Sequence, residues 1–114
     1  MLVPYNNELY RCDFCEKGFK QSEVNVNWKC PDCKKPICIK VEIGEYLHSC
    51  HRLKPTELES GYSLTFDRKH THEIINVSPY GNTYKVALRD YGTMNFNKND
   101  FALVIDGAWV ELNY

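Results

Sequence analysis

The chain has 114 residues, of which 43% are hydrophobic and 25% are charged, and its formal net charge is -1 at pH 7. This composition is typical of a folded soluble protein and excludes an intrinsically disordered chain. No apolar run approaches the roughly 18 residues of a membrane-spanning helix, and the first residues have neither the basic start nor the apolar core of a signal peptide. We therefore expect a cytoplasmic protein with a small core that needs additional crosslinks.

Charge is distributed unevenly between the two halves of the chain. Residues 1–55 contain nine Lys or Arg against seven Asp or Glu, which gives +2, and residues 56–114 contain five against eight, which gives -3. Neither half has the strongly basic balance of a protein that binds nucleic acid mainly by neutralising phosphates. The charge therefore lowers the expectation of nucleic-acid binding without removing it.

Residues 1–55 are predicted to contain short amphipathic strands. Residues 9–11 should form a strand that leads into Cys12, and residues 24–28 alternate apolar and polar side chains in the manner of a half-buried strand. Residues 37–43 alternate in the same way and predict a longer strand. In residues 45–53 the apolar positions are instead compatible with two turns of helix.

Four cysteines are arranged as two C-x-x-C pairs that are separated by fourteen residues: Cys12, Cys15, Cys30 and Cys33. Two residues between the members of a pair allow one tight turn to present both sulfurs to a single ion, and thiolates bind zinc tetrahedrally at about 2.3 Å. Three disulfides among the six cysteines are the alternative, but they would suit a secreted protein. The spacing therefore predicts one structural Zn²⁺, whose four ligands leave no position for a catalytic water.

Over about residues 9–44 the chain resembles the zinc-ribbon superfamily. The usual second knuckle of that superfamily is C-P-x-C-G-x-x-I, and here it reads CPDCKKPI from Cys30 to Ile37, with Lys34 in place of the glycine. Because that glycine normally adopts a left-handed conformation, a lysine there would cost on the order of 1 kcal/mol. The resemblance implies metal binding at the end of a small antiparallel sheet and does not imply a particular function.

Residues 56–114 are predicted to form a second unit of short strands. The expected strands are 62–66, 73–77, 83–89 and 93–96, with turns at 78–82 and 90–92. Residues 101–105 and 108–112 flank Asp106-Gly107, which is a strong signal for a two-residue hairpin turn. We therefore predict a mainly β protein with a zinc-ribbon domain in residues 1–55 and a small antiparallel β-barrel or sheet in residues 56–114.

The length and strand rhythm of residues 56–114 resemble an SH3-like barrel of the kind found in KOW, Tudor and related binding domains. In that comparison, residues 99–104 would form a short 3-10 turn before the last strand and not the first arm of a hairpin. SH3-like barrels commonly bind partners through aromatic residues in turns. The resemblance therefore makes Tyr80 and Tyr91, which fall in predicted turns, candidate contact residues.

A second set of potential metal ligands follows the knuckles: Cys38, His48, Cys50 and His51. Four such groups could hold a second zinc. The alternative is preferred, because Cys38 should lie on the strand face opposite Ile37 and Ile39, and residues 48–51 should form a local turn. The His70-Thr-His72 segment is similarly interpreted as a polar hairpin end and not as a metal site.

Several lysines surround the second knuckle, including Lys34 and Lys35, and Trp28 or Phe14 could stack on a base if this face bound nucleic acid. Near-neutral charge and exposed aromatic residues favour a protein interface instead. We therefore predict a non-enzymatic, zinc-stabilised binding module or regulator that contacts a protein partner and no membrane. The alternatives are a nucleic-acid-binding protein associated with transcription or translation and, less favoured, a zinc-dependent or redox enzyme.

Overall fold

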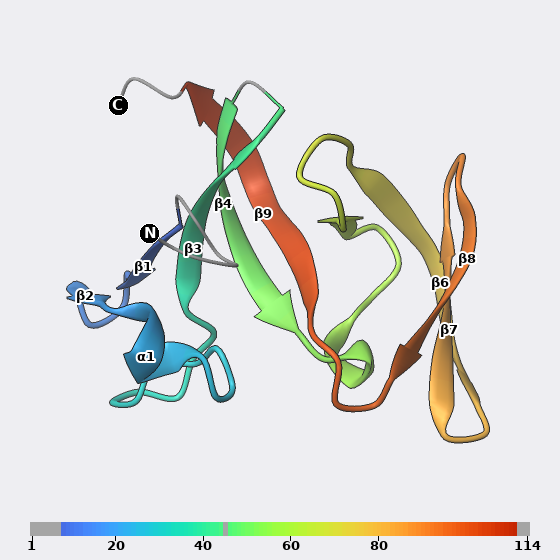
Figure 1. Ribbon diagram of the computed structural model, residues 1–114, viewed down its shortest axis with the longest axis horizontal. Coiled ribbons are helices and arrows are strands. Elements are labelled where there is room, and N and C mark those ends of the chain that lie inside the picture. Colours follow the sequence, from blue (N-terminus) through green and yellow to red (C-terminus); the bar gives the residue numbers. More distant parts are fainter. Residues whose placement is uncertain (1–7, 45, 112–114) are drawn as a thin grey trace. The chain divides into compact units, whose positions relative to one another are not determined.

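The computed structural model describes residues 8–44 and 46–111, and in these ranges the protein is mainly β (Figure 1). They contain nine strands, a four-residue helix, α1 (Gln21–Val24), and a 3-10 turn, η1 (Pro55–Glu57). The mainly β fold class predicted from the sequence is confirmed. No helix in the described ranges is long and apolar enough to cross a membrane.

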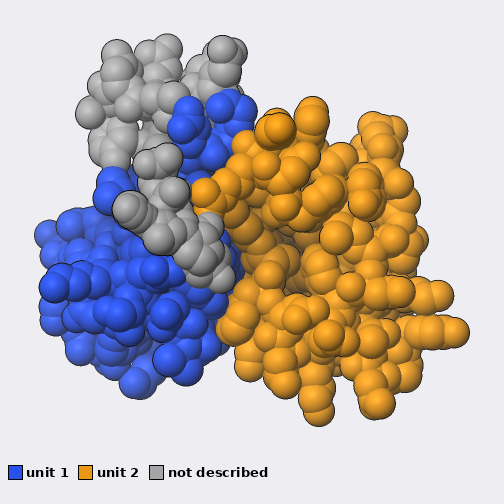
Figure 2. All heavy atoms as spheres, viewed as in Figure 1, with its two compact units in different colours: residues 1–52, 106–114 blue, residues 53–105 orange. Residues whose placement is uncertain are grey.

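The chain divides into two compact units (Figure 2). Unit 1 consists of residues 1–52 and 106–114, and unit 2 consists of residues 53–105. The last strand, β9 (Ala102–Glu111), begins in unit 2 and ends in unit 1. Unit 1 therefore takes its residues from both ends of the chain.

Unit 1 contains a small antiparallel sheet. Its strands are β1 (Leu9–Cys12), β2 (Lys17–Phe19), β3 (Cys38–Ile43) and β4 (Tyr46–Leu53), in the order β2-β1-β3-β4. Tyr10 lies opposite Phe19 on one side and Ile39 on the other, and Ile39 lies opposite Cys50. The strands predicted at residues 9–11 and 37–43 are confirmed.

A buried ion pair joins Arg52 of β4 to Glu8, the residue directly before β1. The guanidinium of Arg52 donates two hydrogen bonds of 2.8 Å to the carboxylate of Glu8, and the hydroxyl of Tyr10 donates a third, also of 2.8 Å. The ring centroid of Trp28 lies 4.4 Å from the Arg52 guanidinium carbon. Burial, followed by the hydrogen bond to Glu8, raises the pKa of Tyr10 above its usual value, so this hydroxyl stays protonated.

Two elements of unit 1 differ from the sequence prediction. Residues 46–53 form strand β4, not a helix, because five successive residues pair with β3 through a turn at Gly44, whose φ is 65°. Residues 24–28 do not form a strand, because α1 ends at Val24 and Trp28 has a φ of 59°. Long-range strand pairing overrides a weak helical spacing in the first case, and a left-handed residue breaks the alternation in the second.

Unit 2 is a meander whose last strand returns to pair with its first. The strands are β5 (Ser63–Thr65), β6 (His72–Tyr80), β7 (Thr83–Leu88) and β8 (Gly92–Asn97), with the unit 2 part of β9, in the order β9-β5-β6-β7-β8. Ser63 lies opposite Glu73 on one side and Ile105 on the other. Among the described residues β8 pairs with β7 alone, so the sheet is open. Of the two predicted forms of this unit, a small barrel or a sheet, the structure has the sheet.

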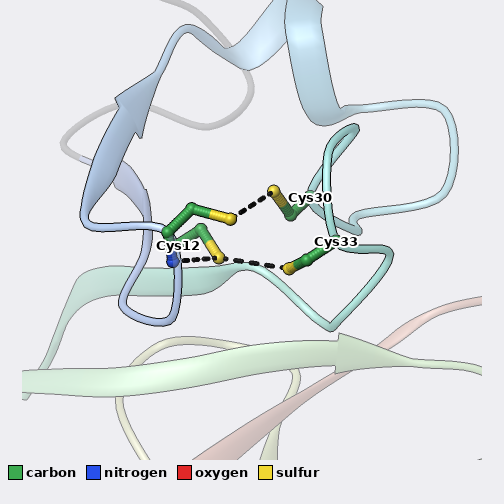
Figure 3. Close-up of side chains that lie close together, drawn as sticks. Cys12, Cys30 and Cys33 are labelled. Carbon is green, nitrogen blue, oxygen red and sulfur yellow. Dashed lines mark hydrogen bonds between the residues drawn. The ribbon is translucent and has the colours of Figure 1, made fainter.

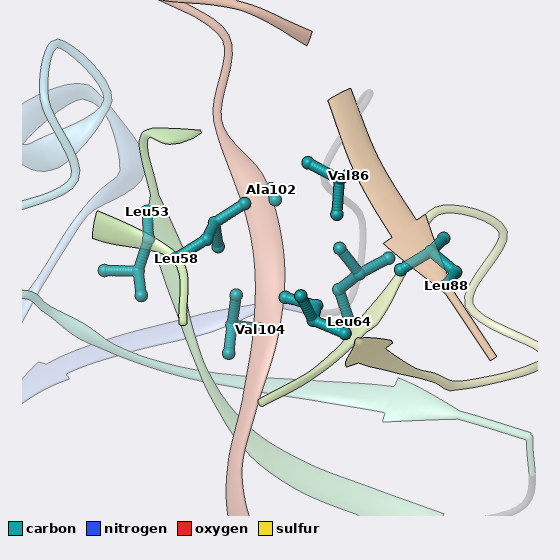
Figure 4. Packing of buried hydrophobic residues seen from close by; sticks show 8 residues of the cluster. Leu53, Leu58, Leu64, Val86, Leu88, Ala102 and Val104 are labelled. Carbon is teal, nitrogen blue, oxygen red and sulfur yellow. The ribbon is translucent and has the colours of Figure 1, made fainter. Parts of the chain in front are cut away.

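The core of unit 2 is a cluster of aliphatic side chains (Figure 4). Its buried members are Leu53, Leu58, Leu64, Ile74, Val86, Leu88, Ala102 and Val104. Half-buried Val77, Met94 and Phe96 pack against this cluster. Strands β5, β6, β7 and β9 contribute members of the cluster and β8 packs against it, so the core holds the meander together.

The hairpin predicted at Asp106-Gly107 is wrong. Strand β9 runs through both residues without a turn, from Ala102 to Glu111. The alternative 3-10 turn over residues 99–104 is also wrong, since β9 has begun by Ala102 and residues 98–99 form the turn. Pairing of Leu103, Val104 and Ile105 with β5 keeps the chain extended, and this long-range contact outweighs the local turn preference of Asp-Gly.

Candidate metal centre and exposed aromatic residues

Two turns of unit 1 bring the four knuckle cysteines together (Figure 3). Cys12 ends β1, Cys15 lies in the turn before β2, and Cys30 and Cys33 lie in the turn that precedes β3. The Sγ atoms all lie within 4.8 Å of one another, with 3.5 Å between those of Cys12 and Cys33 and 3.9 Å between those of Cys30 and Cys15. No disulfide joins these four residues.

This spacing fits a tetrahedral ion. Four sulfurs bound at about 2.3 Å lie about 3.8 Å from one another, which is close to the separations of 3.5 and 3.9 Å observed between sulfur pairs. The group could therefore hold one metal ion after only small movements of the side chains. All four positions of a tetrahedral shell would then be filled by protein atoms.

Backbone N–H groups of both knuckles point at the sulfurs. The N–H of Cys15 donates to Cys12 Sγ and the N–H of Asp32 donates to Cys30 Sγ, each at 3.4 Å. Lys34 has a φ of 67°, so this lysine adopts the left-handed conformation that the glycine of the zinc-ribbon pattern normally has. Glu16 occupies the equivalent position of the first knuckle with a φ of 53°.

The four thiols do not ionise equally. Burial acts to raise the pKa of Cys30, but hydrogen bonds from the backbone of Cys33 and Asp32 outweigh burial and lower it to about 7. Burial and, after it, the neighbouring thiols together raise the pKa of Cys15 to about 12. The thiol of Cys30 therefore ionises more easily than that of Cys15, and a bound cation would favour the thiolate form of its ligands.

The second set of potential ligands is not gathered into a site. Among residues 8–44 and 46–111, the knuckle cysteines form the one group of three or more His, Cys, Asp or Glu that could hold a metal. Strand alternation places His48 and Cys50 on the face of Val41 and Ile39, their partners in β3. Cys38 and His51 occupy the alternate positions and therefore the opposite face.

The histidines of this set have other environments. His51 Nδ1 lies 2.8 Å from the carbonyl oxygen of Ile37, whereas His48 Nδ1 is buried and has no hydrogen-bond partner among the described atoms. Burial lowers the pKa of His48, so its ring is neutral at physiological pH. His70 Nδ1 lies 3.1 Å from Asp67 Oδ2 at the surface. This pair lies in the connection between β5 and β6, at the predicted polar hairpin end.

The surface near the first knuckle includes an exposed aromatic ring next to a lysine. Phe14 is 69% exposed, and Lys35 Nζ lies 4.0 Å from its ring centroid. Lys34 is also exposed and donates to the carbonyl oxygen of Pro31 at 2.9 Å. Trp28 is only 4% exposed, so the expectation that it could stack on a base is wrong.

The two candidate tyrosines of unit 2 lie on separate surfaces. Tyr80 is 63% exposed at the end of β6, and Lys85 Nζ lies 4.0 Å from its ring centroid. Tyr91 is 52% exposed in the turn after β7. Strand β7 lies between them, and its six residues span about 20 Å, so a small ligand cannot contact both tyrosines.

Tyr91 belongs to a group of three rings that we call the aromatic cluster: Phe66, His72 and Tyr91. Their centroids are 5.4 Å apart for Phe66 and His72, 4.9 Å for Phe66 and Tyr91, and 5.2 Å for His72 and Tyr91. Phe66 follows β5, His72 begins β6 and Tyr91 precedes β8, so the strand register brings together residues from the β5–β6 and β7–β8 connections. The sequence signal for this cluster is that each ring borders a predicted strand end, but of the three residues only Tyr91 was predicted to contact a partner. No protein-family model, curated protein or solved structure matches the chain.

Proposed function

We propose that this protein is a non-enzymatic binding module that contacts a protein partner through the aromatic cluster. The observation that supports the proposal most directly is that Phe66 and Tyr91 are 44% and 52% exposed although their rings pack against each other. Rings that support one another lose little side-chain entropy on binding, and aromatic residues are enriched at the centres of protein interfaces.

The proposed ion at the knuckles is a single structural Zn²⁺ held by the four cysteines. Soft thiolate donors in a tetrahedral group of four suit zinc, and the closed shell leaves no position for substrate or catalytic water. Thiolate ligands also require a reducing compartment, which supports a cytoplasmic location. The zinc would stabilise the fold and take no part in a reaction.

We propose that the open sheet of unit 2 has an SH3-like strand arrangement. Support comes from the strand order β9-β5-β6-β7-β8, in which a meander is completed by a last strand that pairs with the first. The aromatic cluster lies at the turns between β5 and β6 and between β7 and β8. This placement agrees with the resemblance to barrels that bind partners through turn aromatics.

The protein-binding proposal can be tested by affinity capture from the native host with the full chain and two variants. Tyr91→Ser removes the outer ring of the aromatic cluster, and Tyr80→Ser is a matched control because Tyr80 is also exposed and lies at the other end of β7. We expect a specific protein to be retained by the wild type and by Tyr80→Ser and to be depleted about tenfold or more by Tyr91→Ser. Equal retention by all three chains would contradict the proposal.

Nucleic-acid binding by the ribbon is the second candidate, and the exposed Phe14 ring beside Lys35 is the observation that favours it. Its weakness is that nearby cations already have acidic partners: Arg11 lies 3.3 Å from Asp13, and Lys17 lies 3.4 Å from Asp32. Titration with single- and double-stranded oligonucleotides at two salt concentrations tests it. Micromolar binding that falls steeply with salt and is lost in Phe14→Ala would favour this function over protein binding.

A further inference from the structure

The β8 strand is an open edge of the unit 2 sheet. It consists of six residues, Gly92–Asn97, and all six pair with β7 without a break in register. Within the described part of the chain no strand pairs with its outer side. The N–H and C=O groups of Asn97 hydrogen-bond with Asp100. The outward backbone groups of the rest of the strand remain available for another strand.

This edge lacks the features by which proteins usually prevent strand addition. Such edges are typically very short, carry lysine or proline, or contain a bulge. Strand β2, the edge strand of unit 1, has three residues and begins with Lys17. In contrast, β8 (sequence GTMNFN) contains no charged residue and no proline, and its register has no bulge.

The side chains of β8 alternate between two surfaces. Met94 and Phe96 are half-buried against the core of unit 2, whereas Thr93, Asn95 and Asn97 are exposed. A strand with the same alternation would cover the remaining flanks of Met94 and Phe96 and pair its polar side chains with the polar face. The β8 strand itself has this alternation.

Opposite charges flank the two ends of β8. Asp90 precedes the strand and Lys98 follows it, and both are exposed. The other two nearby charges have partners within unit 2, since Arg89 Nε lies 2.9 Å from Glu73 Oε1 and Asp100 Oδ2 accepts the N–H of Asn97 at 2.8 Å. In an antiparallel pair of two β8 strands, the acidic end of each strand meets the basic end of the other.

We propose that β8 pairs antiparallel with β8 of a second copy of this chain, which gives a two-fold dimer centred on Met94. In this register Met94 faces Met94 of the other copy, Thr93 faces Asn95, and Lys98 is level with Asp90. A shift of one residue along one strand would set polar against apolar positions. Centring on Asn95 would instead bring Asp90 level with Asp100, so the charges select the register at Met94.

This association does not depend on the proposed protein contact, although Tyr91 of the aromatic cluster directly precedes β8. The interface is isologous, so a closed dimer is expected and not a growing fibre. Pairing of two six-residue strands buries less surface than the roughly 1,200 Å² of a standard stable interface, so we expect weak, concentration-dependent association.

Sedimentation equilibrium of the full chain, from about 10 μM to about 1 mM at low salt, tests this proposal; this range covers weak complexes. The wild type should form dimers within it. Lys98→Glu and Asp90→Lys each replace attraction by repulsion at both ends of the interface, and each should weaken dimerisation about tenfold. An equimolar mixture of the two variants should dimerise about as well as the wild type, because the heterodimer has opposite charges at both ends.

Lys69→Glu is the matched control, since Lys69 is an exposed lysine in the turn between β5 and β6, away from β8 in the sequence. It should dimerise like the wild type. A second edge variant, Thr93→Lys, places a charge within β8 and should also weaken dimerisation. Any of three results would overturn the proposal. The wild type could remain monomeric over the whole concentration range, Lys98→Glu could dimerise as tightly as the wild type, or the mixture of the two charge variants could stay monomeric.

Discussion

Replacing Arg52 by methionine should destabilise unit 1 severely, because the change leaves the Glu8 carboxylate without its cation inside the core. The side chains of Arg52 and Glu8 are 9% and 0% exposed. Methionine fills a similar volume but provides neither of the two hydrogen bonds that Arg52 donates to Glu8. It also removes the guanidinium that lies 4.4 Å from the Trp28 ring centroid.

The expected loss is about 3–5 kcal/mol of the free energy of unfolding, which is the usual cost of removing one partner of a buried ion pair. A domain of this size is typically stable by only about 5–15 kcal/mol, so the loss is a large fraction of the total. In the double variant Glu8→Leu/Arg52→Met no charge remains buried. It should therefore regain most of this loss.

The measurement is urea denaturation with zinc in excess, followed by circular dichroism and tryptophan fluorescence, with unit 1 and unit 2 fitted as separate transitions. Arg89→Met is the control, because Arg89 also pairs with a glutamate, Glu73, at 2.9 Å, but both side chains are about half exposed. This variant should lose at most about 1 kcal/mol. A loss below about 1 kcal/mol for Arg52→Met, or a double variant less stable than Arg52→Met, would refute the reasoning.

Three further predictions concern the metal centre and the turns. Metal analysis should give about one zinc per chain. Cys30→Ser should lose the zinc and unfold unit 1, whereas Cys38→Ser should keep the zinc. Release of zinc by Cys38→Ser would show that the proposed ligand set is wrong. Lys34→Gly should stabilise unit 1 by up to about 1 kcal/mol in thermal unfolding, because φ at this position is 67°; an unchanged midpoint would argue against strain there. Hydrogen bonds from the backbone of His70 and Lys69 lower the pKa of Asp67. The contribution of the ionised Asp67 carboxylate to the free energy of unfolding should therefore be present above about pH 4 and disappear as the pH falls below that value. The difference in urea midpoint between wild type and Asp67→Asn should therefore shrink on acidification, and a constant difference would contradict the assignment.

The features that the sequence predicted well depend on short spacings. The C-x-x-C pairs specify their own turns, and strands such as β3 (Cys38–Ile43) show an alternation that one segment reveals by itself. In each case the determining interactions lie within a few residues of one another.

The features that the sequence did not reveal depend on distant contacts. Glu8 and Arg52 are 44 residues apart, and only the pairing of β1, β3 and β4 brings them together. The aromatic cluster requires the register of β5 against β6 and the return of the chain after β7. The Asp106-Gly107 turn signal failed for the same reason, since pairing with β5 keeps β9 extended.

The course of β9 has a consequence for the order in which the protein can fold during synthesis. Unit 2 ends at residue 105, whereas unit 1 includes residues 106–114 as well as residues 1–52. Unit 2 is therefore an insertion within unit 1 and leaves the ribosome complete before unit 1 does. The two cysteine knuckles can bind a metal ion early, but the unit that contains them is finished last, when the end of β9 emerges. A fragment that stops after residue 55 would retain all four ligands and lack part of its own unit.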